Sequence, residues 1–173
     1  MAKNTNLNYN NILKNTNSDD VINILKSLIN KGDNVSLDIV IDVYKNVNNK
    51  NLEKLIFELF IIVNDKKFAK KMISLLDYNF EQQKKVKLIS FFWQSKMNFI
   101  DYLDKFIFLT NTNVIEYLIE LFTVIERIID ENEINNKKLD DFANQIKTYI
   151  HGKEKPVQLL LAQLVNVVLR NNL

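Results

Sequence analysis

An all-α domain is the fold class that this 173-residue sequence predicts, on three observations. Apolar residues recur at helical spacing from about residue 19 onward, and the strand-like alternation of apolar and polar residues is hard to find. Two Gly and one Pro are too few for turn-dense β architectures. The composition, 47% hydrophobic and 25% charged, is typical of a globular chain with a sizeable core.

The apolar pattern predicts nine successive helices. The first begins after Ser18, which can serve as its N-cap with Asp19 and Asp20 in the first turn, and it ends at Gly32. The third is apolar over more than half of its circumference, so we expect it to be central. The nine helices are predicted at about residues 19–31, 36–47, 52–63, 66–78, 80–95, 99–110, 114–130, 137–150 and 156–171.

Repeated helix starts suggest repeated structural units. Three starts share one capping pattern, in which an Asn is followed three residues later by a side chain that can reach back: Asn79 with Gln82, Asn98 with Asp101, and Asn113 with Glu116. The helix pairs recur every thirty to forty residues or so, roughly the period of helical repeats. Short connectors favour antiparallel neighbours. The sequence therefore predicts an α-solenoid of about four helical hairpins plus a C-terminal helix, with an up-and-down bundle as the alternative.

We expect residues 18–173 to form a single helical repeat domain and the polar residues 1–17 to form a flexible N-terminal segment. That N-terminal stretch has no apolar run of the length that a signal peptide requires. The longest apolar runs, such as residues 59–63, are far too short for a membrane span. The expectation is a cytoplasmic protein that does not associate with a membrane.

The charges argue against nucleic acid as the main partner. Lys+Arg 23 and Asp+Glu 21 give a net charge of +2, and the positive charge is dispersed among nearly as many carboxylates. Arginine, the side chain best suited to phosphate, occurs at Arg127 and Arg170 alone. A solvated charged face is the first interpretation of the densest basic stretch and a partner-binding patch the second. This stretch comprises Lys66, Lys67, Lys70 and Lys71, followed by Lys84, Lys85 and Lys87.

Candidate catalytic and metal-binding residues all have a simpler structural interpretation. The chain has no Cys and one His, His151, which is expected at a helix C-terminus where the helix dipole favours it. Asp101 and Asp104 fit capping and the first helical turn. Residues 130–141 have the length of a calcium loop, but Asn135 stands where the sharp turn requires Gly. A non-enzymatic protein without metal or cofactor is therefore predicted.

The most distinctive local sequence joins the fifth and sixth predicted helices, and we single out Trp93, Gln94 and Tyr102 there. Core packing is the first interpretation of the Trp, because a buried Trp removes about 150 to 250 Å² from water. An exposed Trp at this position would instead be the leading hot-spot candidate for a partner. Glu116 and Glu120, spaced i,i+4, are assigned to a solvated face.

The last predicted helix has a narrow polar stripe and is apolar elsewhere. The terminal helix of a solenoid normally turns a polar face outward. Packing of this helix into a groove of its own chain is the first interpretation, and pairing with a second chain is the other. In a homodimer the interface residues would be Leu160, Leu164 and Val168.

The helix spacing, together with FFWQSKMNFIDYLDKF at residues 91–106 and LFTVIERI at residues 121–128, resembles HEAT-like and armadillo-like repeat proteins. The two stretches resemble a group of small HEAT-like proteins of Bacteroidetes-type bacteria. The resemblance implies a right-handed α-α superhelix with a surface for a macromolecule, and it supplies no catalytic residues. Classical HEAT hairpins commonly carry a Pro in the first helix and an Asp and an Arg in the turn and second helix, whereas this chain has one Pro.

Two functions of different classes follow from these observations. The first is a non-enzymatic scaffold that binds a protein partner through one face of an α-solenoid, with homodimerisation through the last helix as an option. The second is a nucleic-acid-associated module that uses the lysine-rich helices, by comparison with HEAT-like DNA glycosylases.

Overall fold

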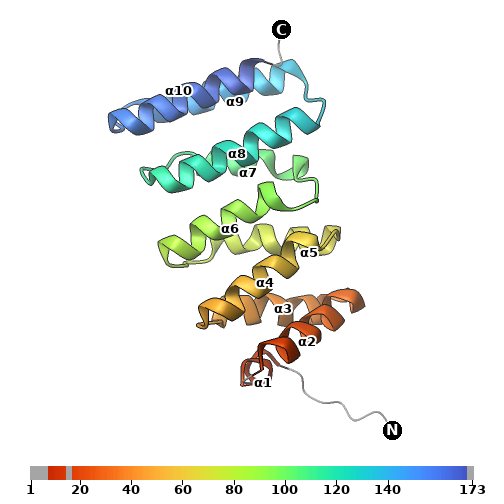
Figure 1. The fold of residues 1–173 in the computed structure, drawn as a ribbon. Coiled ribbons are helices and arrows are strands. Elements are labelled where there is room, and N and C mark those ends of the chain that lie inside the picture. The colour runs from red at the N-terminus through yellow and green to blue at the C-terminus, as the bar shows by residue number, and fades with distance from the viewer. Residues whose placement is uncertain (1–7, 15–16, 171–173) are drawn as a thin grey trace. The chain divides into compact units, whose positions relative to one another are not determined.

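The computed structural model describes residues 8–14 and 17–170, and every regular element in these residues is a helix (Figure 1). The predicted all-α class is confirmed. The structure divides into two compact units, and the single domain predicted over residues 18–173 stays a prediction. The first unit comprises residues up to Asp77 with 95–97, and the second comprises residues 78–94 and those from Asn98 onward. None of the described helices combines the length and hydrophobicity that crossing a bilayer requires.

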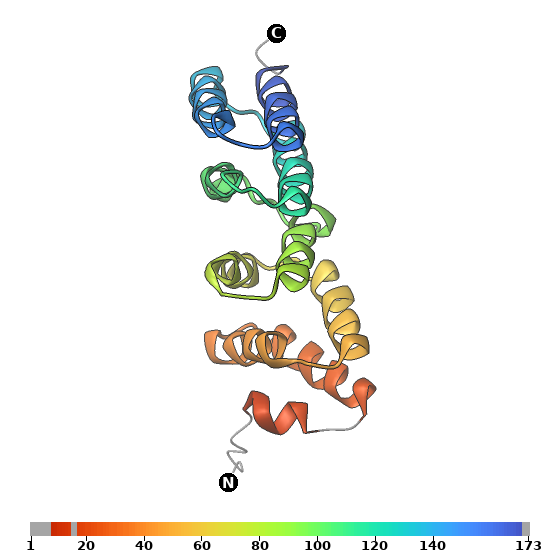
Figure 2. The same cartoon turned by 90° about the vertical axis from the view of Figure 1, so that its left-hand side faces the viewer.

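The first unit has two layers. Helix α3 packs against α1, α2 and α5, and α2 also packs against α4, so α2 and α4 lie on one side and α3 and α5 on the other (Figure 2). Its core contains fully buried Tyr44, Phe60 and Phe68, whose neighbouring ring centroids lie 5.4 and 5.0 Å apart. The elements are α1 (Tyr9–Leu13), α2 (Ser18–Lys31), α3 (Asn34–Asn46), α4 (Lys50–Ile62), α5 (Lys66–Ser74) and the 3-10 turn η1 (Leu75–Asp77).

The first predicted helix is confirmed as α2, with a different N-cap. The side chain of Asn17, not Ser18, accepts the N–H of Asp19 at 3.0 Å. At the C-terminus Gly32 adopts the left-handed conformation, with φ at 63°, as the sequence predicted. Its N–H donates to the carbonyl of Leu28 at 3.3 Å, which satisfies one of the last carbonyls of α2.

Helix α1 lies inside the segment that was predicted to be flexible. Its Ile12 is 2% exposed, in a helix that packs against α3, and Asn8 caps the helix by accepting the N–H of Asn11 at 3.0 Å. One buried aliphatic side chain in a mostly polar stretch is a weak sequence signal. The same prediction for residues 1–7 and 15–16 lies outside the described residues.

Asp33 caps α3 and gives this unit a pH-dependent element. One carboxylate oxygen accepts the N–H of Ser36 at 2.8 Å and the other accepts its hydroxyl at 2.9 Å. The backbone bond is the larger cause, and together these bonds lower the pKa of Asp33 from 3.8 to about 2.

Because the folded pKa lies below the unfolded value, the cap contributes its full stability above about pH 4 and loses it as the pH falls toward about 2. We expect an NMR titration of the Asp33 carboxyl to give a midpoint near 2. We also expect the urea midpoint of Asp33→Asn to vary less than that of the wild type across this pH window. A titration midpoint at the ordinary value of 3.8 would contradict this prediction.

The second unit also has two layers. Helix α8 packs against α6, α7 and α10, while α9 packs against α7 and α10. Helices α6, α8 and α10 therefore form one layer and α7 and α9 the other (Figure 2). The elements are α6 (Gln82–Gln94), the 3-10 turn η2 (Ile100–Tyr102), α7 (Leu103–Leu109), α8 (Ile115–Glu131), α9 (Asn136–Ile150) and α10 (Lys155–Arg170).

Two of the predicted helix starts in this unit differ from the structure. Asn98 accepts the N–H of Ile100 at 2.8 Å, but the N-cap position of η2 is Phe99, which has no side-chain cap. The predicted cap at Asn113 is wrong, because α8 begins one residue later, after Val114, and has no side-chain cap. The hydroxyl of Thr112 instead accepts the N–H of Val114 at 3.1 Å.

An aromatic cluster forms the core of the second unit at the C-terminal end of α6. Phe91, Phe92, Phe99 and Phe106 are each at most 2% exposed. Phe92 is central, with its ring centroid 5.0 to 5.2 Å from those of the other three. These edge-to-face contacts fix the last turn of α6, which carries Trp93.

Candidate interaction surface

Trp93 is the partly exposed member of three consecutive aromatic residues. Adjacent helical positions differ by about 100° around the axis, so the three side chains cannot all face the core. Phe91 and Phe92 point into the aromatic cluster, and Trp93 is 36% exposed. Core packing, the first interpretation of this Trp in the sequence, therefore describes only part of the side chain.

Polar contacts from α8 hold Trp93 in place. Its indole Nε1 donates to Glu120 Oε2 at 2.6 Å. The guanidinium Nη1 of Arg127 donates to the carbonyl of Trp93 at 2.7 Å and to that of Phe92 at 3.3 Å. Arg127 Nε also donates to Glu131 at 2.8 Å, which orients the guanidinium. We call Trp93, Glu120, Arg127 and Glu131 the Trp93 cluster.

The side chain of Arg127 caps the C-terminus of the neighbouring helix α6. The last carbonyls of an α-helix have no partner within the helix and carry partial negative charge, so a cation there is favourable. Arg127 was not among the site residues predicted from the sequence, because its partners lie 34 and 35 residues earlier in the chain. A contact between residues this far apart in the chain cannot be predicted from local sequence spacing.

Arg127→Met is expected to lower the free energy of unfolding by about 1.5 kcal/mol, since hydrogen bonds from a charged donor to the end of α6 are lost. The emission of Trp93, the sole Trp, should change as well. Urea unfolding followed by fluorescence and circular dichroism measures both effects. Arg170→Met is the matched control, because the ion pairs of Arg170 are more exposed and are expected to contribute much less. Equal losses in the two variants would contradict this assignment.

Helix α8, which contributes three residues of the Trp93 cluster, also has exposed acidic and apolar side chains. Because α8 has α6 and α10 as lateral neighbours and packs against α7, its exposed side chains face away from the other layer. Ile119 is 48% exposed, and Glu116 is also exposed. Glu120 is therefore not simply part of a solvated face, because it holds the indole of Trp93.

The two residues that the sequence grouped with Trp93 lie outside the Trp93 cluster. Gln94 is half-buried and ends α6 directly after the Trp. Tyr102 is half-buried in η2, which packs on α7. Both remain predicted partner-binding residues, and neither contributes to the Trp93 cluster.

The seven lysines of the basic stretch divide between the two units. Lys66, Lys67 and Lys70 are exposed on α5, whereas Lys71 pairs with Asp38 of α3. On α6 the remaining three are half-buried, and two of them lie over aromatic rings, with Nζ 5.3 Å from the centroid of Phe80 and 5.8 Å from that of Tyr117. The α6 lysines are Lys84, Lys85 and Lys87.

The predicted oligomer interface on the last helix needs a correction. Leu164 and Val168 are fully buried where α10 packs against α8 and α9, so these two side chains belong to the core of their own unit. Leu160 is half-buried, and Leu159 is 57% exposed. A homodimer through Leu160 stays a prediction.

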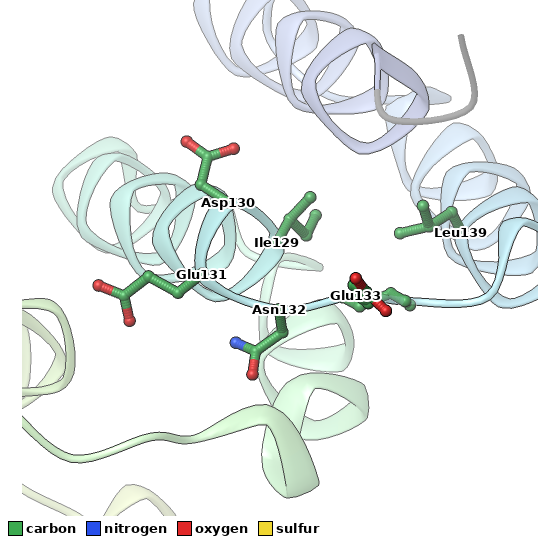
Figure 3. Close-up of a pocket in the computed structure, with 7 residues that line it drawn as sticks. Ile129, Asp130, Glu131, Asn132, Glu133 and Leu139 are labelled. Atoms are coloured by element: carbon green, nitrogen blue, oxygen red, sulfur yellow. The ribbon is translucent and has the colours of Figure 1, made fainter.

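The turn between α8 and α9 forms an acidic pocket of about 380 Å³ (Figure 3). Its carboxylates do not converge: Asp130 binds Arg170 Nη2 at 2.5 Å, and Glu131 binds Arg127. In the figure Glu131 and Asp130 point in different directions from the end of α8. The described residues contain no group of three or more potential ligands arranged for a metal ion.

The remaining candidates for catalysis or metal binding, Asp101, Asp104 and His151, lie at or next to helix ends. Asp104 accepts from Lys138 Nζ at 3.0 Å, which links the N-terminus of α7 to α9, and Asp101 is exposed in η2. His151 follows α9 as its C-cap residue, at the helix end where the sequence placed it.

Searches against protein-family models, curated proteins and solved structures find no match to this chain.

Proposed function

We propose that this protein is a non-enzymatic interaction scaffold, a short HEAT-like α-solenoid that binds a protein partner through the face of α6 and α8 that carries Trp93. The helix contacts support the solenoid within each unit. In the second unit α8 packs against α6 and α10, two helices away on each side, while α7 packs against α9. In the first unit α2 packs against α4 and α3 against α5. A solenoid of stacked helical hairpins has this pattern, because each hairpin contacts its neighbours.

The single observation that carries the proposed partner site is the partly exposed, immobilised indole of Trp93. Hot spots of protein interfaces are enriched in Trp, Tyr and Arg, and an anchor that is already fixed loses little entropy on binding. The bond to Glu120 and the aromatic cluster beneath fix the indole before any partner arrives. Ile119 supplies exposed apolar area on the adjacent helix.

Selection of peptides from a random display library on the immobilised protein tests this proposal without a known partner. Because Trp93 is the sole Trp, its emission reports directly whether a selected peptide reaches this surface. We expect selected peptides to shift that emission and to bind Trp93→Ala about thirtyfold more weakly, the effect of a 2 kcal/mol hot spot.

Leu159→Ala is the control for this test, since it removes an exposed apolar side chain of the same layer outside the Trp93 cluster. Its affinity for the peptides is expected to stay within about twofold of the wild type. Peptides that bind well and depend on Leu159 but not on Trp93 would move the partner site to α10 and overturn the assignment.

A nucleic-acid-associated module is the second candidate function, favoured by the three neighbouring exposed lysines of α5, Lys66, Lys67 and Lys70. Titration of labelled duplex and single-stranded DNA at two salt concentrations separates the candidates. A scaffold for protein partners is expected to show no salt-dependent binding. A steep salt dependence that is lost when the three lysines become Gln would favour the second candidate.

A further inference from the structure

A second recess lies in the same unit at the opposite end of α6 from Trp93. It has a volume of about 230 Å³ and lies between the first turns of α6 and α8 and the C-terminus of α7. Buried Ile89 and Leu121 form its floor, and Phe108, which is 64% exposed, stands at its edge. We call this the Phe108 pocket; Lys85, Leu109, Asn111, Thr112 and Tyr117 complete its lining.

The turn that borders the Phe108 pocket is held by its own hydrogen bonds. The N–H of Thr112 donates to the carbonyl of Thr110 at 2.8 Å, and the hydroxyl of Thr110 donates to the carbonyl of Ile107 at 2.7 Å. Thr110 is fully buried. A turn fixed in this way keeps the pocket open without a ligand, which reduces the entropy lost when one binds.

The charges of the Phe108 pocket select the chemistry of a ligand. Lys85 is the sole charged residue of the lining, and its Nζ lies 5.8 Å from the ring centroid of Tyr117. Asn111, which is exposed, also lines the pocket and has amide N–H donors. Burial, with a smaller effect of Glu116, raises the pKa of Tyr117, so its phenol stays neutral.

We propose that the Phe108 pocket binds an acidic segment of a partner protein, which inserts one bulky apolar side chain and places a carboxylate beside Lys85. The apolar floor accepts the side chain, and the lysine and the Asn111 amide supply the donors that a carboxylate requires. Phe108 covers the inserted group and loses its own exposure to water. This site goes beyond the proposed Trp93 surface, since Lys85 precedes Trp93 by eight residues, about 12 Å along α6.

Fluorescence anisotropy with two labelled, amidated peptides tests the proposal on the full chain. One peptide has the sequence Asp-Glu-Phe-Asp-Glu, and the other replaces each acidic residue with Lys. We expect the acidic peptide to bind in the micromolar range and the lysine peptide at least tenfold more weakly. Phe108→Ser and Lys85→Met are each expected to weaken the acidic peptide at least fivefold. Both substitutions spare the buried floor of the pocket.

Matched control variants distinguish binding at the Phe108 pocket from nonspecific binding of the peptide. Leu159→Ser removes an apolar side chain of similar exposure, and Lys87→Met removes a charge two residues from Lys85, on the other side of α6. Both variants are expected to bind the acidic peptide like the wild type. Trp93→Ala is expected to do the same, so this test remains informative even if the proposal for the Trp93 surface is wrong. No binding up to about 1 mM peptide, equal binding of the lysine peptide, or equal losses in the control variants would overturn the proposal.

Discussion

Phe92→Ala is expected to lower the free energy of unfolding by about 4 kcal/mol, the largest effect of any substitution considered for this chain. Phe92 is 1% exposed and touches three other rings, with the nearest ring centroid at 5.0 Å. Truncation to Ala removes its burial and leaves a cavity among side chains that cannot close around it. The loss also releases the last turn of α6, so the emission of Trp93 is expected to shift toward that of a solvated indole.

Urea unfolding of the full chain, followed by circular dichroism and by Trp93 emission from the second unit, measures this loss. Phe108→Ala is the matched control, because it is the same substitution at a residue that is 64% exposed. We expect it to change the unfolding free energy by about 0.5 kcal/mol or less. A loss below about 1 kcal/mol for Phe92→Ala would show that the aromatic cluster is not the core of this unit.

Leu164→Ala is expected to lower the free energy of unfolding by about 3 kcal/mol, because Leu164 is fully buried between α10 and its neighbours. Leu159→Ala on the same helix is the control and is expected to change it by about 0.5 kcal/mol or less, since Leu159 is 57% exposed. The pair distinguishes the two interpretations of the last helix that the sequence left open.

Light scattering behind a sizing column completes that distinction. If the wild type is a dimer and Leu160→Glu converts it to a folded monomer, α10 forms an interface through its half-buried side. If Leu164→Ala destabilises the protein while the molecules that stay folded keep the wild-type solution mass, Leu164 contributes to the core and not to an interface. A dimer that is lost in Leu164→Ala while the chain stays folded would contradict the burial of this side chain.

Helix positions could be predicted from the sequence where local chemistry determines them. Gly32 ends α2 because its left-handed conformation suits a residue without a Cβ, and the apolar period of residues 52–63 identifies α4. The prediction at residues 99–110 is partly right, because the helix begins with the 3-10 turn η2. Helix α1 was missed because a five-residue element carries too few apolar positions for a period to show.

The candidate sites could be predicted less well, since their residues meet through contacts between helices. Trp93 was selected from its residue type, but its partners Glu120 and Arg127 lie 27 and 34 residues away. Phe108 was not selected at all, because an exposed Phe and a buried one have the same place in an apolar pattern. Their difference depends on which side of α7 faces α8, and that is decided by packing.

Arg170 has a consequence for how the second unit assembles. It binds Glu126 at 3.3 Å and Asp130 at 2.5 Å, two carboxylates that repel each other at i,i+4 on α8. During synthesis α8 emerges before the chain has reached this arginine, and Arg127, which caps α6, likewise follows α6. Helices α6 and α8 therefore each acquire their compensating charge from the helix that is made two places later. The layer should consolidate in the order of translation, with α8 losing its internal repulsion only when α10 docks.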